Sequence, residues 1–174
     1  MDSSTHNFYI VPALLRLFPD SKFLIPIRDP ISWLDSYIDY GINNRLQAGN
    51  NALSPQKTRM GLFRYGDLYH KYTEGEKILK DFEMPSVEAH LFFYRNHYQT
   101  MLSIVPDARR IVYNTFELEE NISTICRFLD ITPAYLNLTN LQMNKGSTKH
   151  HVVAALDKLY LKEKVDFYCG DLHT

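Results

Sequence analysis

The chain has 174 residues, of which 45% are hydrophobic and 13% aromatic, and its formal net charge is -1. This length suits one domain with its own core, so we predict a single domain over residues 1–174. The apolar content excludes a disordered tail. The balanced charge argues against duplex nucleic acid or an anionic membrane as the main partner, yet it permits a local cluster of cations around a small anion.

The remaining composition excludes several other classes. Cys126 and Cys169 are too few for a disulfide framework, and Cys126 is expected to be a buried thiol. No spacing of His, Cys and carboxylate residues fits a metal site. The N-terminus is polar where a signal peptide would be basic and then apolar, and no apolar run approaches the roughly 18 residues of a spanning helix. The sequence therefore favours the cytoplasm over the Golgi lumen, without deciding between them.

The first part of the chain predicts a helix, a strand and a second helix. Residues 8–18 indicate a short helix with Pro12 in its first turn, and residues 22–27 form an apolar run typical of a parallel strand. Asp29 is suited to cap the next helix and Pro30 to occupy its first turn. That helix is expected to reach about residue 46, because apolar residues recur at spacings of three and four: Ile31, Leu34, Ile38 and Ile42.

The rest of the chain predicts a further strand between helices. Residues 58–82 are polar and rich in tyrosine, and we expect helical pieces there. Ser86 is predicted to cap a long helix to residue 105, with one buried stripe of Leu91, Tyr94, Tyr98, Met101 or Leu102, and Val105. Residues 110–116 indicate a second strand, with Tyr113 and Phe116 in its core, followed by helices at 119–129 and 150–168. This order predicts an α/β fold with a parallel sheet flanked by helices.

The end of the first strand carries the strongest chemical signal. Arg28 stands where α/β folds place ligand contacts, and the free N–H groups of the following helix favour an anion. Ser36 comes eight residues later, about two turns into that helix. A guanidinium fork together with a hydroxyl suits a phosphate group. The alternative is that Arg-Asp-Pro is only a strand end with a surface ion pair.

The segment from Phe18 to Ser36 resembles the strand-to-helix motif of the PAPS-dependent sulfotransferases. In that family an Arg ends the strand, Asp-Pro or Asn-Pro follows, and a Ser eight residues after the Arg joins it on the 3′-phosphate of the donor. Arg28, Asp29, Pro30 and Ser36 match in type and spacing. The resemblance implies that Arg28 and Ser36 bind the 3′-phosphate of 3′-phosphoadenosine 5′-phosphosulfate (PAPS) or of its product PAP.

Two later segments extend the resemblance. Residues 110–131 are similar to the family's strand, acidic turn and following helix, although Thr-Phe-Glu-Leu replaces the usual Tyr-Glu-Asp-Leu and no adenine-facing aromatic residue is carried over. Lys145 and Gly146 resemble the Lys-Gly loop that family members place against the 3′-phosphate, where glycine permits close approach and lysine adds charge. The alternative for Lys145 and Gly146 is an ordinary solvated turn.

His6 is the candidate for the catalytic base. Many family members carry Lys-Thr-His or Lys-Ser-His before the helix that precedes the Arg strand, and Ser4-Thr5-His6 stands at that place. An imidazole titrates near neutral pH and can take the proton of an acceptor hydroxyl. Ser4 replaces the family's lysine, and the alternative for His6 is an exposed terminal histidine.

One expected feature of the family is absent from the sequence. No Gly-rich loop of the kind that holds the 5′-phosphosulfate occurs in it. The resemblance therefore implies a P-loop NTPase-like sulfotransferase fold that is incomplete at the N-terminus, from a truncated or fragmentary member. The same absence disfavours a nucleotide kinase.

The sequence leaves two functions open. The first is a PAPS-dependent sulfotransferase, possessing the 3′-phosphate grip and acting on a hydroxyl or amine of a small-molecule or carbohydrate acceptor without a metal. The second is a non-catalytic nucleotide-binding or scaffold remnant of that fold. Neither the acceptor nor the oligomeric state is indicated. Three tyrosines lie in the expected acceptor region, where they either stack on a ligand or pack in the core: Tyr65, Tyr69 and Tyr72.

Overall fold

The computed structural model describes residues 7–48, 60–61, 63–135 and 148–172. The chain divides into two units: Met1–Arg28 with His97–Met143, and Asp29–Asn96 with Asn144–Thr174. The units are described separately below. Among the helices in the described ranges, none is long and apolar enough to cross a membrane.

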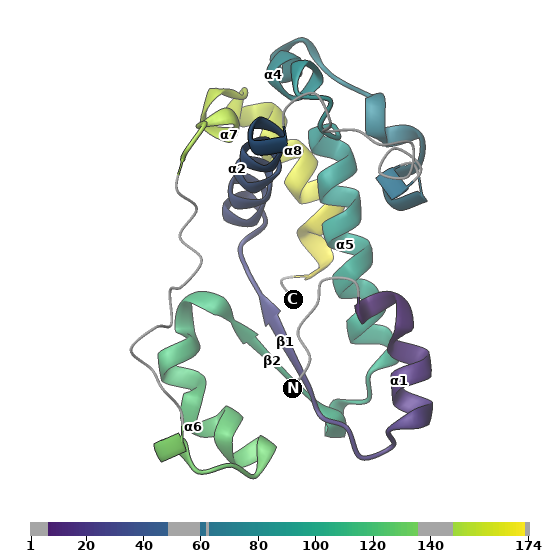
Figure 1. The fold of residues 1–174 in the computed structure, drawn as a ribbon, viewed down its shortest axis with the longest axis vertical. Helices are drawn as coiled ribbons and strands as arrows, with labels where there is room; N and C mark the ends of the chain where they lie inside the picture. The colour runs from purple at the N-terminus through teal and green to yellow at the C-terminus, as the bar shows by residue number, and fades with distance from the viewer. Residues whose placement is uncertain (1–6, 49–59, 62, 136–147, 173–174) are drawn as a thin grey trace. The chain divides into compact units, whose positions relative to one another are not determined.

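The first unit is built around a pair of parallel strands. β1 (Phe23–Ile27) pairs with β2 (Arg110–Asn114), with Phe23 opposite Arg110 and Ile27 opposite Asn114, and the strands lie side by side in Figure 1. A short helix α1 (Val11–Leu17) precedes β1, and α6 (Leu118–Leu129) follows β2. This confirms the predicted parallel strands and the α/β class.

Cations tie the loops of the first unit to these strands. Arg109, just before β2, donates to the carbonyl oxygens of Ser21 and Phe18 at 2.9 and 2.7 Å. Lys22, just before β1, donates to the carbonyl of Phe128 in α6. Each of these bonds joins segments far apart in the sequence, so the turn before β1 is held against both β2 and α6.

The second unit is helical. It contains α2 (Pro30–Ala48), α4 (Lys77–Asp81), the first part of α5 (Val87–Ile104), α7 (Val152–Ala155) and α8 (Lys158–Cys169). The predicted apolar stripe of α2 is confirmed for three residues without solvent exposure, Leu34, Ile38 and Ile42. Ile31 is 39% exposed, so the predicted stripe does not extend to the first turn of α2.

Helix α5 begins as the sequence predicts. The hydroxyl of Ser86 accepts a hydrogen bond from the N–H of Ala89 at 3.1 Å, which is the pattern of an N-cap. The predicted stripe is buried at Leu91, Tyr94, Tyr98, Met101 and Val105. Since α5 contributes residues to both units, this one amphipathic pattern supplies core side chains to each of them.

Two predictions about the later elements were wrong. Phe116 is 68% exposed rather than in the core, because β2 ends at Asn114 and the side chain of Asn114 accepts the N–H of Phe116, turning the chain out of the sheet. The expected helix over 150–168 is two helices, α7 and α8. They are separated because Asp157 caps α8 by accepting the N–H of Tyr160 at 2.7 Å.

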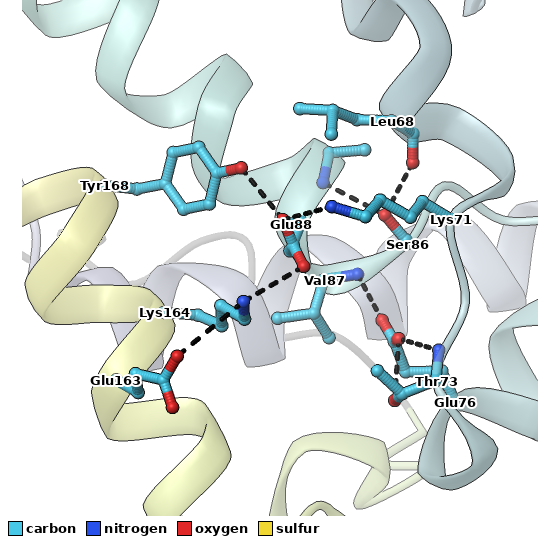
Figure 2. Close-up of polar contacts among 11 residues, drawn as sticks. Leu68, Lys71, Thr73, Glu76, Ser86, Val87, Glu88, Glu163, Lys164 and Tyr168 are labelled. Atoms are coloured by element: carbon cyan, nitrogen blue, oxygen red, sulfur yellow. Dashed lines mark hydrogen bonds and ion pairs between the residues drawn. The ribbon is translucent and has the colours of Figure 1, made fainter.

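Glu88, in the first turn of α5, is a buried carboxylate with three donors (Figure 2). Its Oε1 lies 3.2 Å from Lys164 Nζ, and its Oε2 lies 3.0 Å from Tyr168 Oη and 3.4 Å from Lys71 Nζ. Burial acts to raise the pKa of Glu88, but the hydrogen bonds from Lys164 and Tyr168 and the two lysine charges bring that pKa below its ordinary value. Glu88 thereby fastens α8 to α5.

Glu88→Gln is expected to lower the free energy of unfolding near neutral pH by about 1.5–3 kcal/mol, the usual contribution of hydrogen bonds to a charged group. The folded-state pKa of Glu88 is depressed, so its stabilisation is fully present above the ordinary pKa of 4.5 and is lost as the pH falls through the lower, folded-state pKa. Urea unfolding at successively lower pH should show wild type and Glu88→Gln converging.

Glu163 supplies the matched control, because its side chain is 72% exposed and lies 3.9 Å from the same Lys164. Glu163→Gln should change the free energy of unfolding by no more than about 0.5 kcal/mol. Equal losses in the two variants would show that Glu88 does not hold α8 through its buried position.

Candidate functional site

Arg28 directly follows β1 and lies beside an aromatic ring of the first unit. Its guanidinium carbon is 5.4 Å from the centroid of Phe116, the exposed residue that follows β2. The two residues meet because the carboxyl ends of parallel strands lie at the same edge of a sheet. A cation against a ring face at that edge is an arrangement suited to an anionic, aromatic ligand.

Tyr98 supports the strand end that carries Arg28. Its hydroxyl donates to the carbonyl oxygen of Pro26 at 2.8 Å. Burial raises the pKa of Tyr98 to about 12, Tyr113 adds to this and the charge of Arg28 opposes it. The phenol is therefore protonated at neutral pH and remains a donor, which fixes the backbone two residues before Arg28.

In the second unit, several backbone N–H groups at the start of α2 are already hydrogen-bonded within the helix. Asp29 Oδ1 accepts the N–H of Ser32 at 2.8 Å, and the carbonyl of Asp29 accepts the N–H of Trp33 at 2.9 Å. Pro30 has no N–H to offer. The predicted cap at Asp29 is confirmed, and it leaves fewer backbone donors for an anion than the sequence suggested, so side chains have to supply more of any phosphate grip.

Ser36 lies half-buried in the second turn of α2, the helix that also carries the charged residues Asp35 and Asp39. Lys149 Nζ lies 3.1 Å from Asp35 Oδ2 and 3.0 Å from Asp39 Oδ2. Hydrogen bonds to Asp39 and Asp35 raise the pKa of Lys149 above its ordinary value, so the ammonium stays charged. These ion pairs hold the segment that begins at residue 148 against α2.

His150 strengthens the same attachment. Its backbone N–H donates to Asp39 Oδ1 at 2.9 Å, and its Nε2 lies 3.0 Å from Asn43 Oδ1. The side chain of Asn43 also donates to the carbonyl of Thr148 at 3.0 Å. Residues 148–150 are thus bonded along α2 to three polar residues, Asp35, Asp39 and Asn43, at a spacing of four. We call this set of contacts the α2 clamp.

Of the residues predicted to form the site, the structure describes Arg28 and Ser36, which lie in different units. Arg28 directly follows β1 and Ser36 lies in α2, so their convergence on one phosphate stays a prediction. His6, Lys145 and Gly146 lie outside the described residues. Within the ranges that the structure covers, no group of three or more His, Cys, Asp or Glu side chains is placed to hold a metal ion.

Sequence reasoning missed the roles of two sets of residues. Phe116 was assigned to the core, although the Asn two residues before it is a turn signal. His150 was treated as a helix start, whereas the polar residues at spacings of four on α2 mark the face that receives it. Among the tyrosines of the expected acceptor region, Tyr69 and Tyr72 donate to the carbonyls of Glu83 and Met84, which is a structural use.

Comparison with known proteins supplies one match. The model of a protein family described as a sulfotransferase domain matches residues 3–135, which include both strands, Arg28 and Ser36. No curated protein matches the chain significantly, and neither does any solved structure.

Asp39→Ala should loosen the α2 clamp. Asp39 is almost fully buried, accepts the N–H of His150 and forms an ion pair with Lys149, so its loss removes a charged hydrogen bond worth about 1.5–3 kcal/mol. Amide hydrogen exchange of His150 should therefore accelerate by roughly tenfold or more. Asp35→Ala removes only the outer ion pair of Lys149 and should accelerate that exchange far less. Unchanged exchange in Asp39→Ala would contradict the assignment of the clamp.

Proposed function

The chain belongs to the sulfotransferase family, and on that premise we propose that it binds PAPS and transfers the sulfuryl group to a hydroxyl or amine acceptor. The acceptor oxygen or nitrogen forms a bond to sulfur, and the bond between sulfur and the 5′-phosphate oxygen breaks, which releases PAP. The acceptor proton passes to a base on the protein. Such a transfer depends mainly on positioning the reactants and on stabilising the negative charge of the donor.

The observation that carries this proposal is Arg28 at the carboxyl end of β1, with the exposed ring of Phe116 beside it. A guanidinium presents a fork of donors that matches a phosphate group. The neighbouring ring offers a face on which a base can stack, in the manner of nucleotide-binding platforms. A nucleotide with a 3′-phosphate satisfies both features, since its phosphate and its base are held by one ribose.

Ser36 and the Lys145-Gly146 segment complete the proposed donor grip. The resemblance to the family assigns both to the 3′-phosphate. The α2 clamp supports this assignment, because Thr148 to His150, which follow Gly146 closely in the chain, are bonded to the helix that carries Ser36. We propose that the clamp keeps this stretch of chain near Ser36. His6 is proposed as the base that takes the acceptor proton.

Arg28→Ala is expected to weaken PAP binding by roughly ten- to over a hundredfold, because a charged hydrogen bond contributes about 1.5–3 kcal/mol. Binding of AMP, which lacks the 3′-phosphate, should change little. Isothermal calorimetry of both nucleotides with wild type and Arg28→Ala measures the difference directly.

Arg127→Ala is the control for a general loss of positive charge, since Arg127 is an exposed residue of α6 in the same unit. It should leave both affinities unchanged. If Arg28→Ala weakens AMP and PAP equally, Arg28 supports the fold rather than recognising the 3′-phosphate.

His6→Ala should depress sulfuryl transfer from PAPS far more than it depresses PAP binding, because a general base contributes to the reaction step by about 100- to 10,000-fold. Turnover with a panel of hydroxyl and amine acceptors, measured beside PAP calorimetry, separates the two effects. Unchanged turnover in the variant would remove His6 from the mechanism. PAP binding by wild type without turnover on any acceptor would favour the non-catalytic alternative.

A further inference from the structure

Pro26 lies inside β1, two residues before Arg28, and stands opposite Tyr113 in the pairing with β2. A proline has no N–H group, so it cannot donate to a neighbouring strand, and it is rare inside sheets for that reason. Its carbonyl oxygen is the one backbone group through which another segment can hydrogen-bond to it. The end of β1 that leads to Arg28 therefore depends on what this carbonyl contacts.

Tyr98 of α5 supplies a donor to the carbonyl of Pro26. The hydroxyl lies 2.8 Å from the carbonyl oxygen, an ordinary length for a hydrogen bond from a hydroxyl, and the two residues are 72 positions apart in the chain. The side chain of Tyr98 is 7% exposed, so little water competes for the bond. A helix thus provides part of the anchoring that Pro26 cannot provide within the sheet.

Two further rings hold the side chain of Tyr98. The imidazole of His97 lies 5.0 Å from the Tyr98 ring, with the ring planes at 87°, and Phe8 lies 5.0 Å from the same imidazole at 68°. Phe8 is 7% exposed and belongs to the 3-10 turn Asn7–Ile10 that precedes α1. Edge-to-face ring pairs of this kind favour one arrangement of the side chains. Tyr98 is therefore a donor that is fixed by packing on a helix of 18 residues, which is a more rigid support than a loop.

The guanidinium of Arg28 lies close to this support. Its positive charge acts on Tyr98, where it opposes the rise in the pKa of the phenol that burial causes. The ring of Phe116 lies 5.4 Å from the guanidinium carbon. Pro26, Arg28, Tyr98 and Phe116 all belong to the first unit. Arg28 thus has an aromatic ring beside its charged group and a fixed backbone two residues before it.

We propose that Tyr98 is a positioning residue for recognition of the donor: by holding the carbonyl of Pro26, it sets the direction in which Arg28 leaves β1 and presents its guanidinium to the 3′-phosphate. A guanidinium binds a phosphate through donors in a fixed fork, so a small rotation of the strand end misaligns the bonds. In this role Tyr98 acts through Arg28 and not by contact with the nucleotide. The inference rests on the proposed function, in which Arg28 binds the 3′-phosphate of PAPS or PAP.

Tyr98→Phe removes the hydroxyl and keeps the ring that packs on His97. It should weaken binding of PAP about two- to tenfold, the range of one neutral hydrogen bond, and leave binding of AMP unchanged, because AMP has no 3′-phosphate for Arg28 to hold. Calorimetry of both nucleotides gives the ratio of the two affinities. A hydrogen bond with a purely structural role would lower the stability of the variant without changing that ratio.

A double-mutant cycle with Arg28→Ala separates an action through Arg28 from any other effect of the hydroxyl. In the Arg28→Ala background, Tyr98→Phe should cause no further loss of PAP affinity, since the group that it positions is gone. An equal loss in both backgrounds would show that Tyr98 acts independently of Arg28 and would overturn the proposal.

Tyr69→Phe is the matched control. Tyr69 is also 7% exposed, and its hydroxyl also donates to a backbone carbonyl at 2.8 Å, that of Glu83 in the second unit. Its loss should lower the free energy of unfolding to a similar extent and leave the ratio of PAP to AMP affinity unchanged. Should Tyr98→Phe not fold, Pro26→Gly tests the same point, because it keeps Tyr98 and loosens the same backbone position, and it should lower the ratio.

A ratio that falls in Tyr98→Phe only while Arg28 is present supports the proposal. The proposal is overturned, and the proposed function kept, if Arg28→Ala loses PAP but the ratio keeps its wild-type value in Tyr98→Phe, or in Pro26→Gly where that variant replaces it. Equal weakening of both nucleotides, or an equal fall of the ratio in Tyr69→Phe, overturns it in the same way. If wild type does not bind PAP, or binds it no better than Arg28→Ala, the proposed function fails and the role of Tyr98 fails with it.

Discussion

The parallel pairing of β1 with β2 is the constraint on which the first unit and its candidate site depend. Parallel strands require a long crossover between them, and they place their carboxyl ends at one edge. With Ile27 opposite Asn114, the chain leaves both strands at that edge, and Arg28 meets Phe116 there at 5.4 Å. The contact between the Arg28 guanidinium and the Phe116 ring therefore follows from the register in which β1 and β2 pair. Tyr98 then fixes the backbone of β1 just before Arg28.

The second unit depends on polar groups that are buried and paired. Glu88 fastens α8 to α5, and Glu76 accepts the N–H groups of Thr73 and Val87 and so joins the preceding turn to the start of α5 (Figure 2). Burying a carboxylate is costly unless donors replace its water, and here every oxygen has one.

Membership of the sulfotransferase family gives the general chemistry of this chain. Asp29 and Pro30 leave few free backbone donors at the start of α2, so any phosphate bound there would need side-chain donors. The α2 clamp bonds residues 148–150 to α2, the helix that carries Ser36.

The sequence by itself determined the elements whose signals are local. Periodicity and the capping residues Asp29 and Ser86 predicted α2 and α5, apolar runs predicted both strands, and spacing singled out Arg28 with Ser36, because these features depend on neighbours within a few residues. Tertiary structure alone decided that Phe116 is exposed beside Arg28 and that His150 is bonded to α2. Exposure and pairing depend on segments that lie far apart in the chain, and no local pattern specifies which of them will meet.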